Sequence, residues 1–185
     1  MAVKILGGIH RSRMLRTPTG QDTRPTRAMV REAIFNILRG ETEGARVLDL
    51  FAGSGAMGFE ALSRGAAHAV FCDKAANAAR TVKENARLLK LEDCCTVLQL
   101  VWPQALAHLK AQQQEFDLIF LDPPYKMDVE PVLLDIAQAG LLADSGQIVL
   151  EQSTGQASHI PDMLAVDKAR QYGQTSLYFI THGRG

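Results

Sequence analysis

Residues 47–58 of this chain are Val47-Leu48-Asp49-Leu50-Phe51-Ala52-Gly53-Ser54-Gly55-Ala56-Met57-Gly58. The first five form an almost continuous apolar run, which is typical of a strand buried on both faces of a sheet. Three glycines then follow the GxGxxG spacing, and an amphipathic stretch from Met57 to Arg64 predicts a helix. A strand, a tight turn and a helix in this order bring the backbone close to a ligand at the helix N-terminus. The segment therefore predicts a cofactor-binding turn, provided that other motifs support it.

Strand and helix patterns alternate along the rest of the chain. We expect further strands at 69–72, 96–101, 116–121 and 147–151, and helices at 75–89, 104–112 and 129–139. Two alternating segments joined through Gly173, 165–171 and 176–181, predict an antiparallel pair. The pattern indicates an α/β fold, a doubly wound and mostly parallel sheet with helices on both faces. In such sheets, ligands bind beyond the carboxyl ends of the strands.

The first 40 residues carry a concentrated positive charge. They contain eight basic and two acidic residues, a net charge of +6, which leaves −6 on the remainder of a chain that is neutral overall. Seven of the eight bases are arginine, the residue suited to bidentate phosphate contacts. The charge pattern favours a nucleic-acid partner over a merely solvated surface.

The N-terminal region is expected to be an extension of a catalytic core. Val3 to Arg16 reads as a short hairpin or extended arm, and a helix is predicted from Thr26 to Leu38 with Thr26 as its N-cap. We therefore divide the chain into a basic extension, 1–40, expected to bind nucleic acid and packed on a core, 41–185. The residues expected to contact the nucleic acid, which the family resemblance described below implies is RNA, are Arg11, Arg13, Arg16, Arg24, Thr26 and Arg27.

Composition excludes several other classes. The 185 residues are 46% hydrophobic and 22% charged, which is ordinary for one globular domain. No apolar run approaches the ~20 residues of a membrane span, and the N-terminus lacks the apolar region of a secretion signal. Three cysteines and five histidines show no metal-ligand spacing. We expect a cytoplasmic protein with reduced thiols, no metal and no membrane partner.

Two acidic residues complete the predicted cofactor site. Asp73 lies 20 residues beyond Gly53 at the end of the second strand, where a carboxylate can accept hydrogen bonds from ribose hydroxyls. This contact serves NAD and S-adenosylmethionine equally. Asp49 lies inside an apolar strand, where a carboxylate is costly unless it is hydrogen-bonded. Its expected partners are backbone amides of the glycine turn or the amino group of a ligand's methionine part, and a purely structural role in bracing the turn is the alternative.

The sequence Asp122-Pro123-Pro124-Tyr125 is the most specific motif in the chain. Two prolines fix the backbone and remove two N–H donors, so the Asp122 carboxylate and the Pro123 carbonyl remain as acceptors. Such acceptors suit the exocyclic amine of a nucleobase, because hydrogen bonds from its N–H groups favour a nitrogen whose lone pair can attack a methyl carbon. Tyr125 offers an aromatic face on which an extruded base can stack. The alternative is an ordinary proline turn with a core tyrosine.

These motifs resemble the bacterial 16S rRNA guanine-N2 methyltransferase family (RsmD-like). The resemblance covers nearly the whole chain and includes the glycine turn, the DPPY turn and the segments 5–8, 11–15, 23–26, 31–38, 83–85 and 172–175. It implies a Rossmann-like, class I methyltransferase fold with a seven-stranded sheet whose last strand is antiparallel. It also implies methyl transfer from S-adenosylmethionine to the N2 amine of a guanine in 16S rRNA, a guanine(966)-type site, with S-adenosylhomocysteine as product. The implied partner is 16S rRNA within the small ribosomal subunit or an assembly intermediate, and we expect a monomer.

The site residues follow from the motifs and the resemblance together. We expect the cofactor to be held by Asp49, Ala52, Gly53, Gly55, Asp73, Lys74, Val101 and Trp102, and the reaction to take place at Asp122, Pro123, Pro124 and Tyr125. Two departures from the family pattern stand out. The region Leu100-Val101-Trp102-Pro103 lacks the acid that meets the adenine amine in many relatives, so backbone groups and apolar contact, including contact with Trp102, are the expected substitutes. Asp73 stands where glutamate is commoner.

Three other functions share part of these signals. A DNA adenine or cytosine amino-methyltransferase would carry both site motifs. An NAD-dependent oxidoreductase would explain the GxGxxG spacing and Asp73, but not the DPPY turn or the basic extension. A non-catalytic RNA-binding assembly factor would explain the missing acid near Val101.

Overall fold

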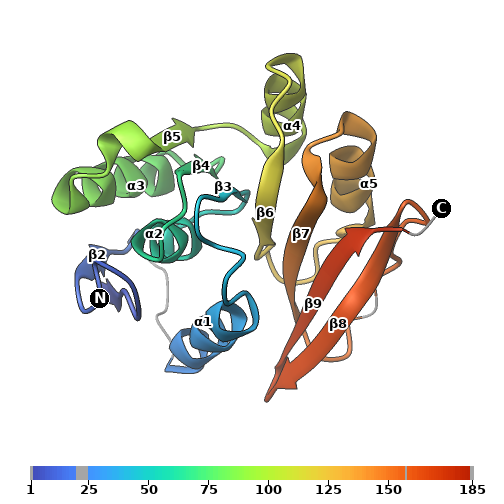
Figure 1. Ribbon diagram of the computed structural model, residues 1–185, viewed down its shortest axis with the longest axis horizontal. Coiled ribbons are helices and arrows are strands. Elements are labelled where there is room, and N and C mark those ends of the chain that lie inside the picture. Colours follow the sequence, from blue (N-terminus) through green and yellow to red (C-terminus); the bar gives the residue numbers. More distant parts are fainter. Residues whose placement is uncertain (1, 20–24, 157, 184–185) are drawn as a thin grey trace.

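A seven-stranded sheet forms the centre of the protein (Figure 1). The computed structural model describes residues 2–19, 25–156 and 158–183. The sheet order is β5-β4-β3-β6-β7-β9-β8, and its strands are β3 (Arg46–Asp49), β4 (His68–Cys72), β5 (Cys95–Leu98), β6 (Phe116–Leu121), β7 (Leu142–Ser153), β8 (Leu164–Tyr172) and β9 (Thr175–His182). β5, β4, β3, β6 and β7 pair in parallel, whereas β9 is antiparallel to both β7 and β8. The predicted mostly parallel sheet with an antiparallel last strand is confirmed.

Helices cover both faces of the sheet (Figure 1). They are α1 (Pro25–Ile37), α2 (Ala56–Ser63), α3 (Ala76–Leu89), α4 (Trp102–Ala111) and α5 (Glu130–Ala139), with a 3-10 turn, η1 (Glu92–Cys94). One apolar core joins the sheet to α1, α2 and α3, and a second joins it to α4 and α5. Alternation along β6 separates the two cores, since Phe120 belongs to the first and Leu121 to the second. No helix in the described ranges is long and apolar enough to cross a bilayer.

Several element boundaries differ from the sequence-based expectations. β5 ends at Leu98 and α4 begins at Trp102, so Val101 is the N-cap of a helix and not the end of a strand. β7 begins at Leu142, because a register shift near Phe116 lets the polar residues before Gln147 continue the strand. The prediction of Thr26 as N-cap is wrong, because α1 begins at Pro25. Proline suits the first helical position, where its missing N–H costs nothing and its φ is already helical.

The N-terminal hairpin packs on the core. It pairs β1 (Ala2–Lys4) with β2 (Met14–Arg16) in an antiparallel arrangement. Ile5 and Leu15 are each only 1% exposed and join the core formed by α1, α2 and α3. The buried Asn85 side chain of α3 accepts a hydrogen bond from the Arg16 N–H (2.8 Å) and donates to the Arg16 carbonyl (3.0 Å). The hairpin is therefore fixed to the rest of the fold by both apolar and polar contacts.

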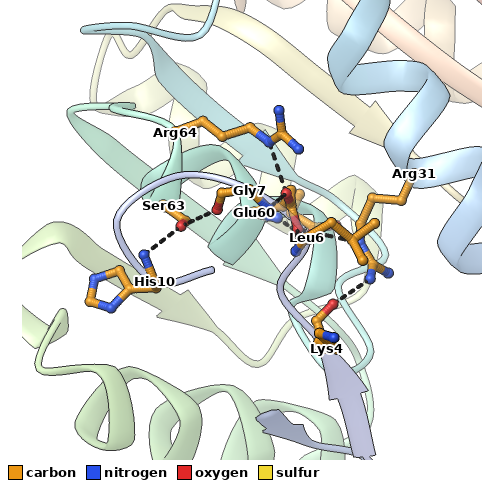
Figure 2. A network of polar contacts seen from close by, with 10 residues as sticks. Lys4, Leu6, Gly7, His10, Arg31, Glu60, Ser63 and Arg64 are labelled. Atoms are coloured by element: carbon orange, nitrogen blue, oxygen red, sulfur yellow. Dashed lines mark hydrogen bonds and ion pairs between the residues drawn. The ribbon is translucent and has the colours of Figure 1, made fainter. Parts of the chain in front are cut away.

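A second anchor is the fully buried carboxylate of Glu60 in α2 (Figure 2). It accepts hydrogen bonds from the N–H groups of Leu6 and Gly7, each at 2.8 Å. It also accepts a hydrogen bond from Arg64 Nε at 2.8 Å and lies 3.6 Å from Arg31 Nε of α1. Arg31 in turn donates to the Lys4 carbonyl at 2.7 Å. One carboxylate thus joins the hairpin, α1 and α2, and its charge is compensated by two arginines.

Replacing Glu60 is expected to destabilise the whole protein. Glu60→Gln leaves one acceptor oxygen for two N–H groups and removes the negative charge beside Arg31 and Arg64. Breaking such a buried pair costs about 3–5 kcal/mol, measured as the free energy of unfolding in urea. The control Glu84→Gln removes an exposed pair with Arg16 (2.8 Å) and should cost less than about 1 kcal/mol. Equal losses for the two variants would contradict the role given to Glu60.

Candidate active site

Three acidic residues lie where neighbouring parallel strands end. Asp49 is the last residue of β3 and pairs with Phe71 of β4 and Phe120 of β6. Asp73 and Asp122 directly follow β4 and β6. Because parallel strands present their carboxyl ends at one edge of the sheet, the loops that begin at these acids are held together.

The glycine turn connects β3 to α2. Gly55 is the N-cap of α2 with φ 78°, a left-handed conformation that other residues rarely adopt. A Cβ on Gly58 would lie 2.3 Å from the Phe71 ring, so this glycine lets α2 pack closely on β4. Gly53 lies against the cavity described below, whereas Gly55 and Gly58 face Phe59 and Phe71. The three glycines of the spacing therefore serve different purposes, one near a ligand and two in packing.

Asp73 fixes the turn from its other side. Its Oδ2 accepts a hydrogen bond from the Gly53 N–H and its Oδ1 accepts one from the Ala75 N–H, each at 2.9 Å. The Ser54 carbonyl receives a further hydrogen bond from Asn85 Nδ2 at 3.0 Å. Because Asn85 also holds Arg16, the same amide links the glycine turn to the N-terminal hairpin.

Asp49 is buried under the glycine turn, with 4% of its surface exposed. Its Oδ2 accepts a hydrogen bond from the Gly58 N–H at 3.1 Å, one of the backbone amides that the sequence predicts as partners. Burial raises the pKa of this carboxyl, the Gly58 hydrogen bond lowers it and the nearby negative charges of Asp122 and Asp73 raise it, so that the resulting pKa is about 7. A positively charged group in the cavity would therefore be stabilised by Asp49 and would favour its ionised form.

The DPPY turn follows β6 at the same carboxyl edge of the sheet. Tyr125 is 74% exposed, so the alternative of a core tyrosine is excluded. The Lys126 ammonium lies over the Tyr125 ring, 5.5 Å from its centroid. The arrangement offers an aromatic face to an incoming planar group next to the acceptors of Asp122 and Pro123.

One cavity of about 1050 Å³ connects the two motifs. Most of the predicted site residues line it, namely Asp49, Ala52, Gly53, Asp73, Lys74, Val101, Trp102, Asp122, Pro123, Pro124 and Tyr125. Small-molecule sites usually have about 300–1,000 Å³, so this one has room for a cofactor and for part of a second ligand.

The cavity lining also includes residues that the motifs do not identify. They come from the N-terminal segment, α1 and β7, and are Val3, Lys4, Leu6, Thr17, Ala28, Arg31 and Glu151. The sequence could have identified Glu151, because it is an acid near the carboxyl end of β7, the strand that follows the DPPY turn. No sequence pattern identifies Arg31, because it resembles the other basic residues of its helix and its burial depends on Glu60.

Three of the basic residues predicted to bind RNA are not among the residues that line the cavity. Arg11, Arg13 and Arg16 are exposed on the hairpin. Arg16 pairs with Glu84, and Arg13 donates a long hydrogen bond to the Leu88 carbonyl (3.4 Å). Arg24, and the side chains of Thr26 and Arg27, lie outside what the structure describes.

In the described part of the chain, no three His, Cys, Asp or Glu side chains are grouped so that they could hold a metal ion. The three cysteines are free thiols, with Cys72 buried and Cys94 and Cys95 half-buried. Burial raises the pKa of the Cys72 and Cys95 thiols to about 12, so both are unreactive as nucleophiles at neutral pH.

Comparison with known proteins identifies the family. Residues 3–181 match the family described as conserved hypothetical protein 95. The chain is 30% identical over 177 residues to the ribosomal RNA small subunit methyltransferase D of Haemophilus influenzae, covering 94% of this chain and 91% of the relative. A solved hypothetical protein of Thermus thermophilus, TTHA0928, is 34% identical, with a TM-score of 0.82 and coverage of 97% and 99%.

A more distant solved structure shares the fold alone. SMU.776, described as a complex with SAH, is 15% identical, with a TM-score of 0.67 over 85% of this chain and 50% of that chain. The family assignment rests instead on the match over nearly the entire length. The chain belongs to the conserved hypothetical protein 95 family, the family of the RsmD-like rRNA methyltransferases.

Proposed function

We propose that this protein transfers a methyl group from S-adenosylmethionine to the exocyclic N2 amine of a guanine in 16S rRNA. The observation that carries the proposal is the single cavity lined by the glycine turn, Asp73 and the DPPY turn. An NAD-dependent oxidoreductase function would leave the DPPY turn without a role. The name of the Haemophilus influenzae relative supports an rRNA of the small subunit as substrate.

The residues at the glycine-turn side fit S-adenosylmethionine. Asp49 is buried, which disfavours an unpaired negative charge. Its carboxylate therefore suits an ion pair with the ammonium group in the methionine part of the cofactor. Asp73 is held rigidly by two backbone N–H groups and keeps acceptor positions for ribose hydroxyls. Trp102 and Val101 offer apolar contact to the adenine. When bound, the cofactor supplies a methyl group on a positively charged sulfur.

The DPPY side fits an amine that donates hydrogens. Asp122 and the Pro123 carbonyl accept the N–H groups of the target amine, and Tyr125 stacks on the base. The chain contributes mainly position and orientation, because the lone pair of the amine must point at the methyl carbon. No strong base is needed before attack, and Asp122 or water takes the proton afterwards.

We propose residues 1–40 as the RNA-binding extension of a 41–185 core. Arg11 and Arg13 on the exposed hairpin contact phosphates, and the anchors at Glu60 and Asn85 keep them at a fixed distance from the cavity. Rigid attachment matters because a phosphate contact can position a base only if the two sites do not move independently.

The direct test is methyl transfer from labelled S-adenosylmethionine to 16S rRNA or small subunits taken from cells lacking this protein. We expect one labelled guanine, modified at N2, when the nucleotide is mapped. Asp122→Ala should lower the rate by at least about 100-fold while S-adenosylhomocysteine binding largely survives, because the acceptor for the amine is lost. Label on DNA and not on rRNA, or undiminished turnover by the variant, would contradict the proposal.

Cofactor affinity should depend on the ionisation of Asp49. Because the pKa of its carboxyl is raised to about 7, the acid is protonated below pH 7 and must lose its proton to pair with the ammonium. We expect S-adenosylhomocysteine affinity, measured by calorimetry, to rise from pH 5.5 to 7, approaching tenfold per pH unit at the acid end. Asp49→Asn should bind weakly with a flat profile, and the exposed Asp93→Asn should behave as the wild type. A flat wild-type profile would refute the pairing.

The hairpin arginines should determine the salt dependence of RNA binding. Replacing Arg11, Arg13 and Arg16 by Gln is expected to weaken binding and to reduce the slope of log affinity against log salt by about 2–3, since each phosphate contact contributes about 0.7–0.9. The matched control replaces three exposed bases elsewhere, Lys110, Lys168 and Arg170, and should leave the slope nearly unchanged. Equal slopes for the two triple variants would show that the hairpin does not contact the RNA backbone.

A further inference from the structure

Glu151 of β7 stands beside Asp122 in the cavity wall. Leu121 and Leu150 form the last residue pair between β6 and β7. Asp122 and Glu151 are the next residues after this pair. Neighbouring strands lie about 4.8 Å apart, so the two carboxylates are close enough to approach one base edge together. Phe120 and Val149, two positions before Asp122 and Glu151, belong to the core beneath α1, so alternation directs the Glu151 side chain to the face that α1 covers.

A buried positive charge faces this carboxylate. Arg31 lines the same cavity and is 6% exposed. Its Nε makes no hydrogen bond to any residue that the structure describes, the Glu60 carboxylate being 3.6 Å away. Burial lowers the pKa of Arg31, and the charges of Glu60 and Glu151 act against this and favour the charged form. The guanidinium therefore presents a positive charge to Glu151 near the DPPY turn, inside the cavity of about 1050 Å³.

The two carboxylates provide the hydrogen-bond acceptors that guanine requires. The Watson–Crick edge of guanine presents two neighbouring donors, the N2 amine and N1–H. Adenine and cytosine present a ring acceptor next to the amine, and a carboxylate would repel that acceptor. An ionised carboxylate accepts hydrogen bonds only, and its two oxygens can serve several donors at once. Asp122 beside Glu151 is therefore a pair of acceptors that matches guanine and rejects the other two amino bases.

We propose that Glu151 is the specificity residue for guanine, accepting the N1–H while Asp122 accepts the N2 amine, with Arg31 positioning Glu151. The inference rests on the proposed function and adds how the base is chosen. A site built to bind a hydrogen-bond donor discriminates strongly against an analogue that lacks it, because the acceptor, once the base covers it, is then left without a partner.

The test compares guanine with 2-aminopurine, which keeps the N2 amine but carries a ring acceptor in place of N1–H. Small subunits are reconstituted with 16S rRNA ligated to carry either base at the mapped target nucleotide, and kcat/KM for methyl transfer is measured. The preference of the wild type for guanine should fall at least tenfold in Glu151→Gln, mainly through faster methylation of 2-aminopurine, because the carboxamide NH2 can donate to the ring nitrogen. Glu151→Asp, which keeps the carboxylate, should retain the preference at a lower rate.

The exposed Glu115→Gln is the matched control and should keep the wild-type ratio of the two substrates. Because each ratio is taken within one enzyme variant, partial loss of fold or of cofactor binding cancels. Glu151→Gln with the wild-type ratio would overturn the role of Glu151 while leaving the proposed function intact. A wild type that methylates neither base would overturn the proposed function itself.

Discussion

The parallel pairing of β3 with β4 and β6 is the constraint on which the site depends. It brings Asp49, Asp73 and Asp122 to one edge of the sheet, where three negative charges oppose one another and one of them is buried. The pKa of Asp49 is raised mainly by its burial, and the charges of Asp122 and Asp73 raise it as well. A ligand with a positive charge relieves the repulsion among the three acids, so the fold creates an affinity for a cationic cofactor before any specific contact is considered.

The second organising feature is that the N-terminal segment forms part of the cavity wall. Glu60 holds the N–H groups of Leu6 and Gly7, and Asn85 joins Arg16 to the glycine turn. The hairpin that carries the proposed RNA contacts is thus built into the same rigid unit as the proposed cofactor site. An RNA held by the hairpin would present a base to the cavity in a defined orientation, which is what discrimination between bases requires.

The sequence predicted the sheet and the order of strands and helices along the chain, because these depend on local periodicity. It also predicted a set of site residues at strand ends, most of which line the cavity. It could not predict the role of Arg31, since the burial of an arginine depends on Glu60, 29 positions further along the chain. The N-cap at Thr26 was wrong because the local preference of proline for the first helical position prevailed. The glycine spacing was interpreted as a ligand turn, whereas the structure places Gly55 and Gly58 against Phe59 and Phe71.

The central claim is that one cavity holds an activated methyl group against the DPPY turn. A crystal structure of the protein with S-adenosylhomocysteine tests it most directly. The account predicts the amino group at Asp49, the ribose at Asp73, and the sulfur facing the space between Asp122 and Tyr125, with room beside it for a nucleobase. A ligand bound outside this cavity, or a sulfur turned away from the DPPY turn, would contradict it.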